Sequence, residues 1–187
     1  MYTPITLARV SAESYKRSDF ETENIEIIKS GQIYAFRGTD EAKDVITDIR
    51  FLPWYTKELG YSAAGFVRTA RHVYEAVEAH YQRTPHHPIT LTGHSLGGAM
   101  ALLVGAYMVR SHMPLERIVT FGAPRVGKLR ILKHIDVEMY KNRRDIVTSQ
   151  PFWLSHPRRN IRIGGGKGWS PLKDHRMNEY IEALKQE

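Results

Sequence analysis

The stretch Ile89-Thr90-Leu91-Thr92-Gly93-His94-Ser95-Leu96-Gly97-Gly98 decides the fold of this chain, because a strand pattern in it changes into a helix pattern within a few residues. Residues 89–92 are predicted to be a strand, and residues 96–111 are apolar nearly all round, which is typical of a buried helix. Residues 93–97 between them have the form Gly-x-Ser-x-Gly. In this setting the pattern predicts a sharp turn that holds the Ser95 hydroxyl clear of the sheet, at the partly positive N-terminus of the helix.

Strand and helix patterns alternate along the rest of the chain, which indicates an α/β fold. In such folds a mostly parallel central sheet is flanked by helices, and functional residues follow the carboxyl ends of the strands. We find no repeat and no long linker, so we expect a single domain over residues 1–187. The predicted helices are residues 4–17, 64–82, 96–111, 127–134 and a last one capped by Asp174, and the predicted strands are residues 25–28, 32–37, 89–92, 117–121, 136–141 and 158–163.

The composition excludes several classes of protein. Apolar residues make up 42% of the chain and charged residues 25%, which is ordinary for a globular protein. Cysteine is missing, so disulfides, thiol catalysis and zinc–thiolate sites are excluded. No apolar run is long enough to span a membrane, and the first residues lack the pattern of a signal peptide. We therefore expect a cytoplasmic protein; export by another route is the alternative.

A serine nucleophile needs a base, and the base needs an acidic residue that orients it. In this architecture the three residues follow in the order Ser, Asp or Glu, His. Asp145 follows the carboxyl end of a predicted strand, whereas Asp136 opens that strand and Glu138 lies inside it, so we predict Asp145 as the acid. The plainer alternatives are that Ser95 only caps the helix and that Asp145 pairs with a neighbouring arginine at the surface.

The predicted base comes from the histidines that follow the acid. The chain has nine histidines, and only His156 and His175 follow Asp145. His156 precedes the last predicted strand, whereas His175 follows that strand and begins the last predicted helix. We therefore predict His175 as the base and keep His156 as the second choice. The alternative for His175 is an exposed residue in the first turn of a helix.

Four short motifs stand out in the sequence: Phe36-Arg37-Gly38-Thr39, Gly93-His94-Ser95-Leu96-Gly97-Gly98, Thr120-Phe121-Gly122-Ala123-Pro124-Arg125-Val126-Gly127 and Asn142-Arg143-Arg144-Asp145-Ile146-Val147. Together they resemble the class 3, or fungal-type, lipases of the α/β-hydrolase fold, and the resemblance runs from about residue 32 to residue 180. It implies a catalytic triad of Ser95, Asp145 and His175. The chain is short for that family and its segment 146–174 is compact, so we expect a compact α/β-hydrolase without a large cap domain.

The resemblance further implies an oxyanion hole, in which N–H groups stabilise the negative oxygen of the transition state. The donors would be the backbone N–H groups of Leu96 and Thr39, with the Thr39 hydroxyl as a further candidate. Thr39 lies just beyond a predicted strand, where such a donor belongs, and a plain turn residue is the alternative. We expect no metal and no organic cofactor. Residues 40–56, with apolar side chains at helical spacing and then an aromatic run, are the candidate lid.

Aromatic residues in the predicted loops indicate where a lipid chain would be bound. The candidate substrate-binding residues are Trp54, Phe152, Trp153 and Trp169. Apolar loops near a serine site can form an acyl-chain pocket or a rim that binds an interface. For any single tryptophan, packing under a loop is the alternative.

Positive charge is concentrated in one segment of the chain. Between Lys141 and Lys173 lie eight basic residues and one acid, so this segment alone carries the net charge of +7. A positive field beside apolar loops favours contact with an anionic membrane surface, and a solvated face without a partner is the alternative. No nucleic-acid motif accompanies the charge, so we expect no nucleic-acid partner.

Three functions are compatible with these residues. The first is hydrolysis of acylglycerol esters, as by a triacylglycerol lipase or esterase, through an acyl-enzyme intermediate. The second is phospholipase A1-like hydrolysis at anionic membranes, which the basic segment slightly favours. The third is a lipid-binding protein without turnover, against which an intact triad argues. The sequence thus predicts a lipid ester as the substrate and leaves the oligomeric state open.

Overall fold

A seven-stranded sheet in which five neighbouring strands run parallel forms the centre of the structure. The computed structural model describes residues 2–22, 25–38, 53–56, 59–83, 87–165 and 170–187. Two antiparallel strands at one edge complete the sheet, so the mostly parallel sheet predicted from the sequence is confirmed. In spatial order the strands are β1 (Phe20–Glu21), β2 (Glu26–Ser30), β3 (Ile33–Phe36), β6 (Ile89–His94), β7 (Leu115–Phe121), β8 (Asp136–Asn142) and β9 (Ile161–Ile163).

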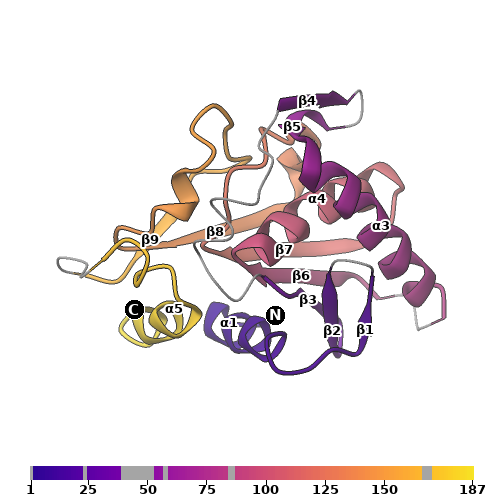
Figure 1. The fold of residues 1–187 in the computed structure, drawn as a ribbon. Coiled ribbons are helices and arrows are strands. Elements are labelled where there is room, and N and C mark those ends of the chain that lie inside the picture. Colours follow the sequence, from indigo (N-terminus) through magenta and orange to yellow (C-terminus); the bar gives the residue numbers. More distant parts are fainter. Residues whose placement is uncertain (1, 23–24, 39–52, 57–58, 84–86, 166–169) are drawn as a thin grey trace.

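Helices cover both faces of this sheet (Figure 1). The first and last helices lie side by side on one face, and the two long helices from the middle of the chain cover the other. Within the described ranges no helix is both long and apolar enough to cross a membrane. The first pair is α1 (Pro4–Glu13) and α5 (Met177–Leu184), and the second pair is α3 (Ala64–Tyr81) and α4 (Leu96–Arg110).

Each central strand supplies side chains to both layers, because successive residues of a strand point to opposite faces. In β3, Ile33 and Ala35 pack in the cluster beneath α1 and α5. Tyr34 and Phe36 of the same strand pack in the larger cluster beneath α3 and α4. The near-continuous apolar sequence of the strand is therefore explained by burial on both sides.

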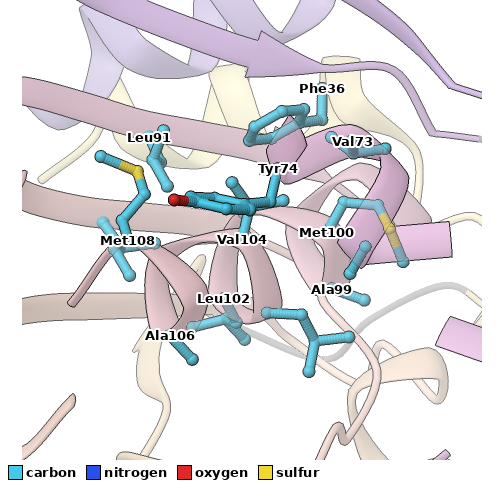
Figure 2. Close-up of a cluster of buried hydrophobic side chains, with 14 of the residues drawn as sticks. Phe36, Val73, Tyr74, Leu91, Ala99, Met100, Leu102, Val104, Ala106 and Met108 are labelled. Carbon is cyan, nitrogen blue, oxygen red and sulfur yellow. The ribbon is translucent and has the colours of Figure 1, made fainter. Parts of the chain in front are cut away.

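The helix that follows the serine is buried on nearly all sides (Figure 2). Every residue of α4 from Gly97 to Ala106 is buried, and so is every residue of β6. Figure 2 shows Met100 and Val104 among side chains from the sheet and from α3. Because α4 packs on both the sheet and α3, its first turn is held firmly at the carboxyl end of β6.

One part of the chain that we predicted as a loop forms strands. β4 (Pro53–Thr56) and β5 (Gly60–Ala63) pair as a separate antiparallel hairpin, so the loop prediction for Trp54 was wrong. A proline opens one strand and a glycine opens the other, and such residues usually mark breaks. The pairing that makes these residues strands is not visible in either segment alone. Of the candidate lid, residues 40–52 lie outside the described residues.

The last helix begins later than its predicted cap. α5 starts at Met177 with Arg176 at the N-cap position, so the capping role predicted for Asp174 was wrong. The Asp174 carboxylate instead accepts a hydrogen bond from the backbone N–H of Arg144 at 3.2 Å. A tertiary contact therefore uses the acidic side chain that local reasoning assigned to the helix. The predicted helix over residues 127–134 is a shorter 3-10 helix, η1 (Arg130–His134).

The turn from β6 into α4 depends on glycine at the point where α4 meets β3. A Cβ atom on Gly97 would overlap the carbonyl group of Phe36, and one on Gly93 would overlap the carbonyl group of Gly97. The blocking atoms belong to the backbone in both cases, so a side-chain movement cannot relieve the overlap. The two glycines of the Gly-x-Ser-x-Gly motif are therefore required by close packing.

We predict that Gly97→Ala lowers the free energy of unfolding by about 1–3 kcal/mol, the usual effect of forcing an extra carbon into a packed site. The loss should appear in urea denaturation even though alanine favours helix more than glycine does. Gly165→Ala is the matched control, because among the described residues no atom apart from those of its chain neighbours lies within 4 Å of the added carbon. Equal stabilities of the two variants would contradict the packing argument.

Candidate active site

Ser95 lies on a strained turn between β6 and α4. Its backbone has φ 56° and ψ −124°, a positive φ that residues with a side chain seldom adopt. Its N–H donates to the carbonyl of Phe121 on β7 at 2.9 Å, and its carbonyl accepts from Gly98 at 3.0 Å, so both sides of the turn are fixed. This geometry presents the hydroxyl at the carboxyl edge of the sheet, as the motif predicts.

Three side chains far apart in the sequence form one chain of hydrogen bonds at this edge. Ser95 Oγ lies 2.9 Å from His175 Nε2, and His175 Nδ1 lies 2.8 Å from Asp145 Oδ2. A carboxylate only accepts, so Nδ1–H donates to Asp145 and the Ser95 hydroxyl donates to Nε2. All three residues are at most 2% exposed. The arrangement leaves Nε2 free of its own proton and directed at the hydroxyl that would attack.

Asp145 is the buried charge of the site, and several donors satisfy it. Its Oδ1 accepts from the backbone N–H of Val147 at 2.8 Å, and its Oδ2 accepts from the Tyr180 hydroxyl at 2.6 Å as well as from His175. Burial, and then the nearby carboxylate of Asp145, raise the pKa of Tyr180, so this hydroxyl keeps its proton and remains a donor. Buried charges are stable only when paired and hydrogen-bonded in this way.

Gly122, from the third motif of the sequence, makes room for the Asp145–His175 pair. It has a φ of +64°, and a Cβ atom there would lie 2.9 Å from Asp145 Oδ2 and 3.0 Å from His175 Nδ1. Its N–H donates to the carbonyl of Tyr140 on β8 at 3.0 Å. Glycine in the motif after β7 therefore allows the side chains of Asp145 and His175 to lie close to the backbone.

His94, the residue before the serine, holds the backbone of the predicted base. Its Nε2 lies 2.6 Å from the carbonyl oxygen of His175, and its Nδ1 lies 2.7 Å from the Tyr15 hydroxyl. Burial, and then the nearby His175, lower the pKa of His94 to about 3, so the ring is neutral. A carbonyl only accepts, so Nε2–H donates to it, and Tyr15 must then donate to Nδ1. Two hydrogen bonds therefore fix the tautomer of His94.

A second set of contacts ties the loop of the acid to the loop of the base. Asn142 Nδ2 donates to the carbonyl of Asp174 at 3.0 Å, and the Asp174 side chain accepts from Arg144, as described above. These bonds run between the segments that carry Asp145 and His175. The spacing of the triad is therefore set by neighbours of the triad residues as well as by the triad itself.

The structure brings together the three residues that we predicted for the triad. It does not pair Asp145 with either neighbouring arginine, since Arg143 forms an ion pair with Glu179 at 3.3 Å. His156, the second choice for the base, hydrogen-bonds the carbonyl of Thr148 instead, and burial lowers its pKa to about 4. Arg143 and His156 therefore have partners outside the triad, and neither takes the place predicted for Asp145 or His175.

The predicted oxyanion donors are only partly described. Leu96 is the first residue of α4, and the N–H groups of a first helical turn have no partner within the helix. Thr39 lies outside the described residues, so its role stays a prediction. Its neighbour Gly38 lies against the nucleophile, because a Cβ atom there would be 3.3 Å from Ser95 Cβ.

Two of the four predicted aromatic residues, Phe152 and Trp153, are exposed on the surface. Phe152 is 74% exposed and Trp153 is 47% exposed, and their rings meet edge to face with centroids 4.7 Å apart. Trp153 lines a cavity of about 530 Å³ beside β5 and residues 127–131, and no triad residue lines it. Trp54 lies in β4, and Trp169 lies outside the described residues.

Sequence reasoning gave no role to Tyr15, His94 or Tyr180. Tyr15 follows α1 and Tyr180 lies in α5, so each reaches the site only because these two helices pack beside the carboxyl edge of the sheet. No local spacing connects them with Ser95. His94 carried the one available signal, since it lies inside the Gly-x-Ser-x-Gly motif, but which groups it contacts depends on the tertiary fold.

A parallel sheet with a strained serine at a strand–helix turn, linked to a histidine and a buried aspartate, defines the α/β-hydrolase class of serine hydrolases. The family follows from a comparison with family models. The model described as "Lipase (class 3)" matches residues 33–155, more than half of the chain, so this protein belongs to the class 3 lipase family. The resemblance drawn from the four motifs is confirmed.

Individual relatives share only part of their length with this chain. The lipase of Rhizopus niveus is 32% identical over 148 residues, which cover 69% of this chain and 38% of that protein. Phospholipase A1-Igamma1, chloroplastic, of Arabidopsis thaliana is 35% identical over 120 residues, which cover 50% of this chain and 23% of that protein. The structure of Rhizomucor miehei triacylglyceride lipase aligns with a TM-score of 0.66 and 24% identity, covering 85% of this chain and 78% of that one, which shows the shared fold.

The buried, neutral state of His94 predicts a pH-dependent stability. Below its ordinary pKa of 6.5 the unfolded chain binds a proton at His94 that the native state, with a pKa of about 3, does not bind. Stability is therefore lost as the pH falls, by about 2 kcal/mol from this residue between pH 7 and pH 5. In His94→Gln, which keeps a donor but does not titrate, the loss measured by urea denaturation at these two pH values should be smaller by that amount. An unchanged loss would contradict the assignment.

We predict that Tyr15→Phe reduces kcat about tenfold and leaves KM nearly unchanged, because a loosened His94 positions His175 less well, and tenfold corresponds to about 1.4 kcal/mol. Ester hydrolysis at saturating substrate gives the measurement. Tyr34→Phe is the control, since Tyr34 forms a similar bond with His80 Nδ1 at 2.9 Å elsewhere. Equal effects of the two substitutions on kcat would mean that Tyr15 acts only through general stability.

Proposed function

We propose that this protein is a serine carboxylic-ester hydrolase that acts on lipid esters through an acyl-enzyme intermediate. The observation that carries the proposal is the unbroken chain of hydrogen bonds from Ser95 through His175 to Asp145. A serine that only caps a helix needs no such partners. Membership of the class 3 lipase family supports a lipid ester as the substrate.

In the proposed reaction each step belongs to a named group. The Ser95 oxygen attacks the ester carbonyl carbon while His175 Nε2 takes the hydroxyl proton, and the carbonyl oxygen becomes an oxyanion. The backbone N–H of Leu96 stabilises this oxygen together with a donor at Thr39. His175 then gives the proton to the leaving alcohol as the carbon–oxygen bond breaks. A water molecule, deprotonated by His175, attacks the acyl-enzyme and releases the fatty acid.

Asp145 keeps the imidazole in the tautomer that this cycle requires, and it stabilises the positive charge on His175 while the proton resides there. It can do so because its own charge is held by Tyr180 and Val147 as well. These donors are already in place before substrate arrives, so little reorganisation accompanies proton transfer.

Phospholipase A1-like hydrolysis at anionic membranes is the second candidate. The observation in its favour is the exposed pair Phe152 and Trp153, which lies in the same segment as the basic residues. Arg144, Arg159 and Arg162 of that segment are exposed, whereas Arg158 is held by the carbonyls of Leu132 and Lys133. Exposed aromatic side chains with cationic side chains nearby are suited to the interfacial region of an anionic bilayer.

The first experiment compares wild type with Ser95→Ala on nitrophenyl esters of increasing acyl length. We expect kcat of the variant to fall by about four orders of magnitude or more, as for the loss of other serine nucleophiles. We expect wild type to prefer long over short acyl chains. Ser155→Ala, at an exposed serine, is the matched control and should keep full activity. Well-folded wild type that hydrolyses no ester would favour a lipid-binding protein without turnover.

The same pair of proteins then distinguishes the substrate classes. Fatty-acid release is measured from triacylglycerol emulsions, from neutral phospholipid vesicles and from vesicles that contain anionic phospholipid. Release from the emulsions alone would support a triacylglycerol lipase. Release from the anionic vesicles that falls with added salt would support the phospholipase candidate, because salt screens contacts between exposed charges.

A further inference from the structure

A groove that neither Ser95 nor Asp145 lines runs between α1 and α5, the two helices that lie side by side in Figure 1. Its volume is about 640 Å³, which is within the usual range for sites that bind small molecules. Apolar atoms of Ala12, Met177 and Ile181 line it. Its lining also includes His94 and His175, so the groove reaches the two histidines of the site.

Three cationic side chains surround this groove: Arg9 and Lys16 from the first helical segment, and Arg176 at the N-cap of α5. All three are exposed, and in the described parts of the chain no carboxylate forms an ion pair with any of them. Among the described residues Glu13 is the one acid of the lining, and it lies 3.7 Å from Arg17, which also pairs with Asp19 at 2.8 Å. Against Glu13 stand the three cations of the lining. The rim therefore carries an excess of positive charge.

The start of α5 adds to this field. The N-terminus of a helix is partly positive, and no side chain caps this one. Met177 and Asn178 of the first turn line the groove next to Arg176. The acidic residue of that turn, Glu179, pairs with Arg143. The groove thus combines an apolar lining, three cations that have no ion-pair partner among the described residues, and a helix N-terminus that no side chain caps.

We propose that this groove binds an anionic amphiphile, a single acyl or alkyl chain with a carboxylate or phosphate head. The head lies among Arg9, Lys16 and Arg176, because guanidinium and ammonium groups bind both kinds of anion. The chain lies over Ala12, Met177 and Ile181, where burial of apolar surface contributes to affinity. A neutral lipid of the same length lacks the contribution of the charged head, and an anion without an acyl chain lacks the contribution of buried apolar surface.

The position of the groove connects the ligand to the catalytic machinery. An occupant contacts His94 and His175, which both line the groove, and His94 holds the backbone of His175. Binding there changes how firmly His175 is positioned. The proposal goes beyond ester hydrolysis, because the site is complete without the nucleophile and binding can be measured without turnover.

The experiment uses full-length Ser95→Ala, so that no ligand is consumed. Equilibrium dialysis below the micelle concentration measures the binding of dodecanoate, dodecyl phosphate, neutral dodecyl maltoside and inorganic phosphate. We expect the two anionic amphiphiles to bind at least ten times more tightly than the neutral one and than inorganic phosphate. The tighter of the two indicates the source, a free fatty acid for the carboxylate or a phospholipid for the phosphate.

Charge variants and amide chemical shifts locate the site. Arg9→Gln/Lys16→Gln/Arg176→Gln should weaken binding of the preferred anion at least tenfold. Arg68→Gln/Arg83→Gln/Lys133→Gln, with the same change in charge at exposed residues outside the groove, should leave it within twofold. The ligand should shift amide resonances of residues 9–16 and 175–181.

Four outcomes would overturn the proposal: equal affinity for the neutral amphiphile, equal loss of affinity in the control triple variant, chemical-shift changes confined to residues 150–154, or failure to bind any amphiphile. None of these results depends on whether wild type hydrolyses esters, so this proposal and the proposed hydrolase function can fail separately.

Discussion

The close approach of α4 to β3 at Gly97 is the constraint on which the site depends. It lets the chain turn from β6 into α4 within one residue, and Ser95 takes the positive φ that such a turn requires. A strained backbone conformation persists only where the surrounding structure stabilises it. Here the buried helix α4 and the hydrogen bond from the N–H of Ser95 to the carbonyl of Phe121 stabilise it. The nucleophile is therefore positioned by packing that extends far beyond the motif in which it lies.

Hydrogen bonds and burial define the polar groups of the site. Asp145 accepts from three donors, and Tyr180 is kept protonated because burial and the neighbouring carboxylate raise its pKa. The carboxylate of Asp145 and the hydroxyl of Tyr180 therefore have their hydrogen-bond partners before any substrate arrives. A half-satisfied network in the same place would destabilise the fold, because an unpaired buried polar group costs about 1–3 kcal/mol. Hydrogen bonding of these buried residues is therefore required both for the stability of the fold and for the proposed catalysis.

The order of strands and helices, the nucleophile and its two partners could be predicted, because each follows from a local pattern and one rule about strand ends. Ser95, Asp145 and His175 all lie where a chain leaves the carboxyl edge of a parallel sheet. Tyr15, Tyr180 and the bonding of Asp174 could not be predicted, since they depend on how α1 and α5 pack together. The β4–β5 hairpin was missed for a related reason: each strand is defined by its partner, and neither has the alternation that marks a strand alone.

Two adjacent histidines of the site have opposite electrostatic requirements. In the proposed mechanism His175 accepts and releases a proton in each cycle, and the ring of His94 lies 4.7 Å from it, centroid to centroid. A positive charge on His94 would oppose protonation of His175 at that distance. Burial and a carbonyl partner keep His94 neutral, so only one of the two rings becomes charged. A hydrogen-bonding residue that stays uncharged is thus what the position before the nucleophile requires, and a histidine meets this requirement only because its surroundings suppress its titration.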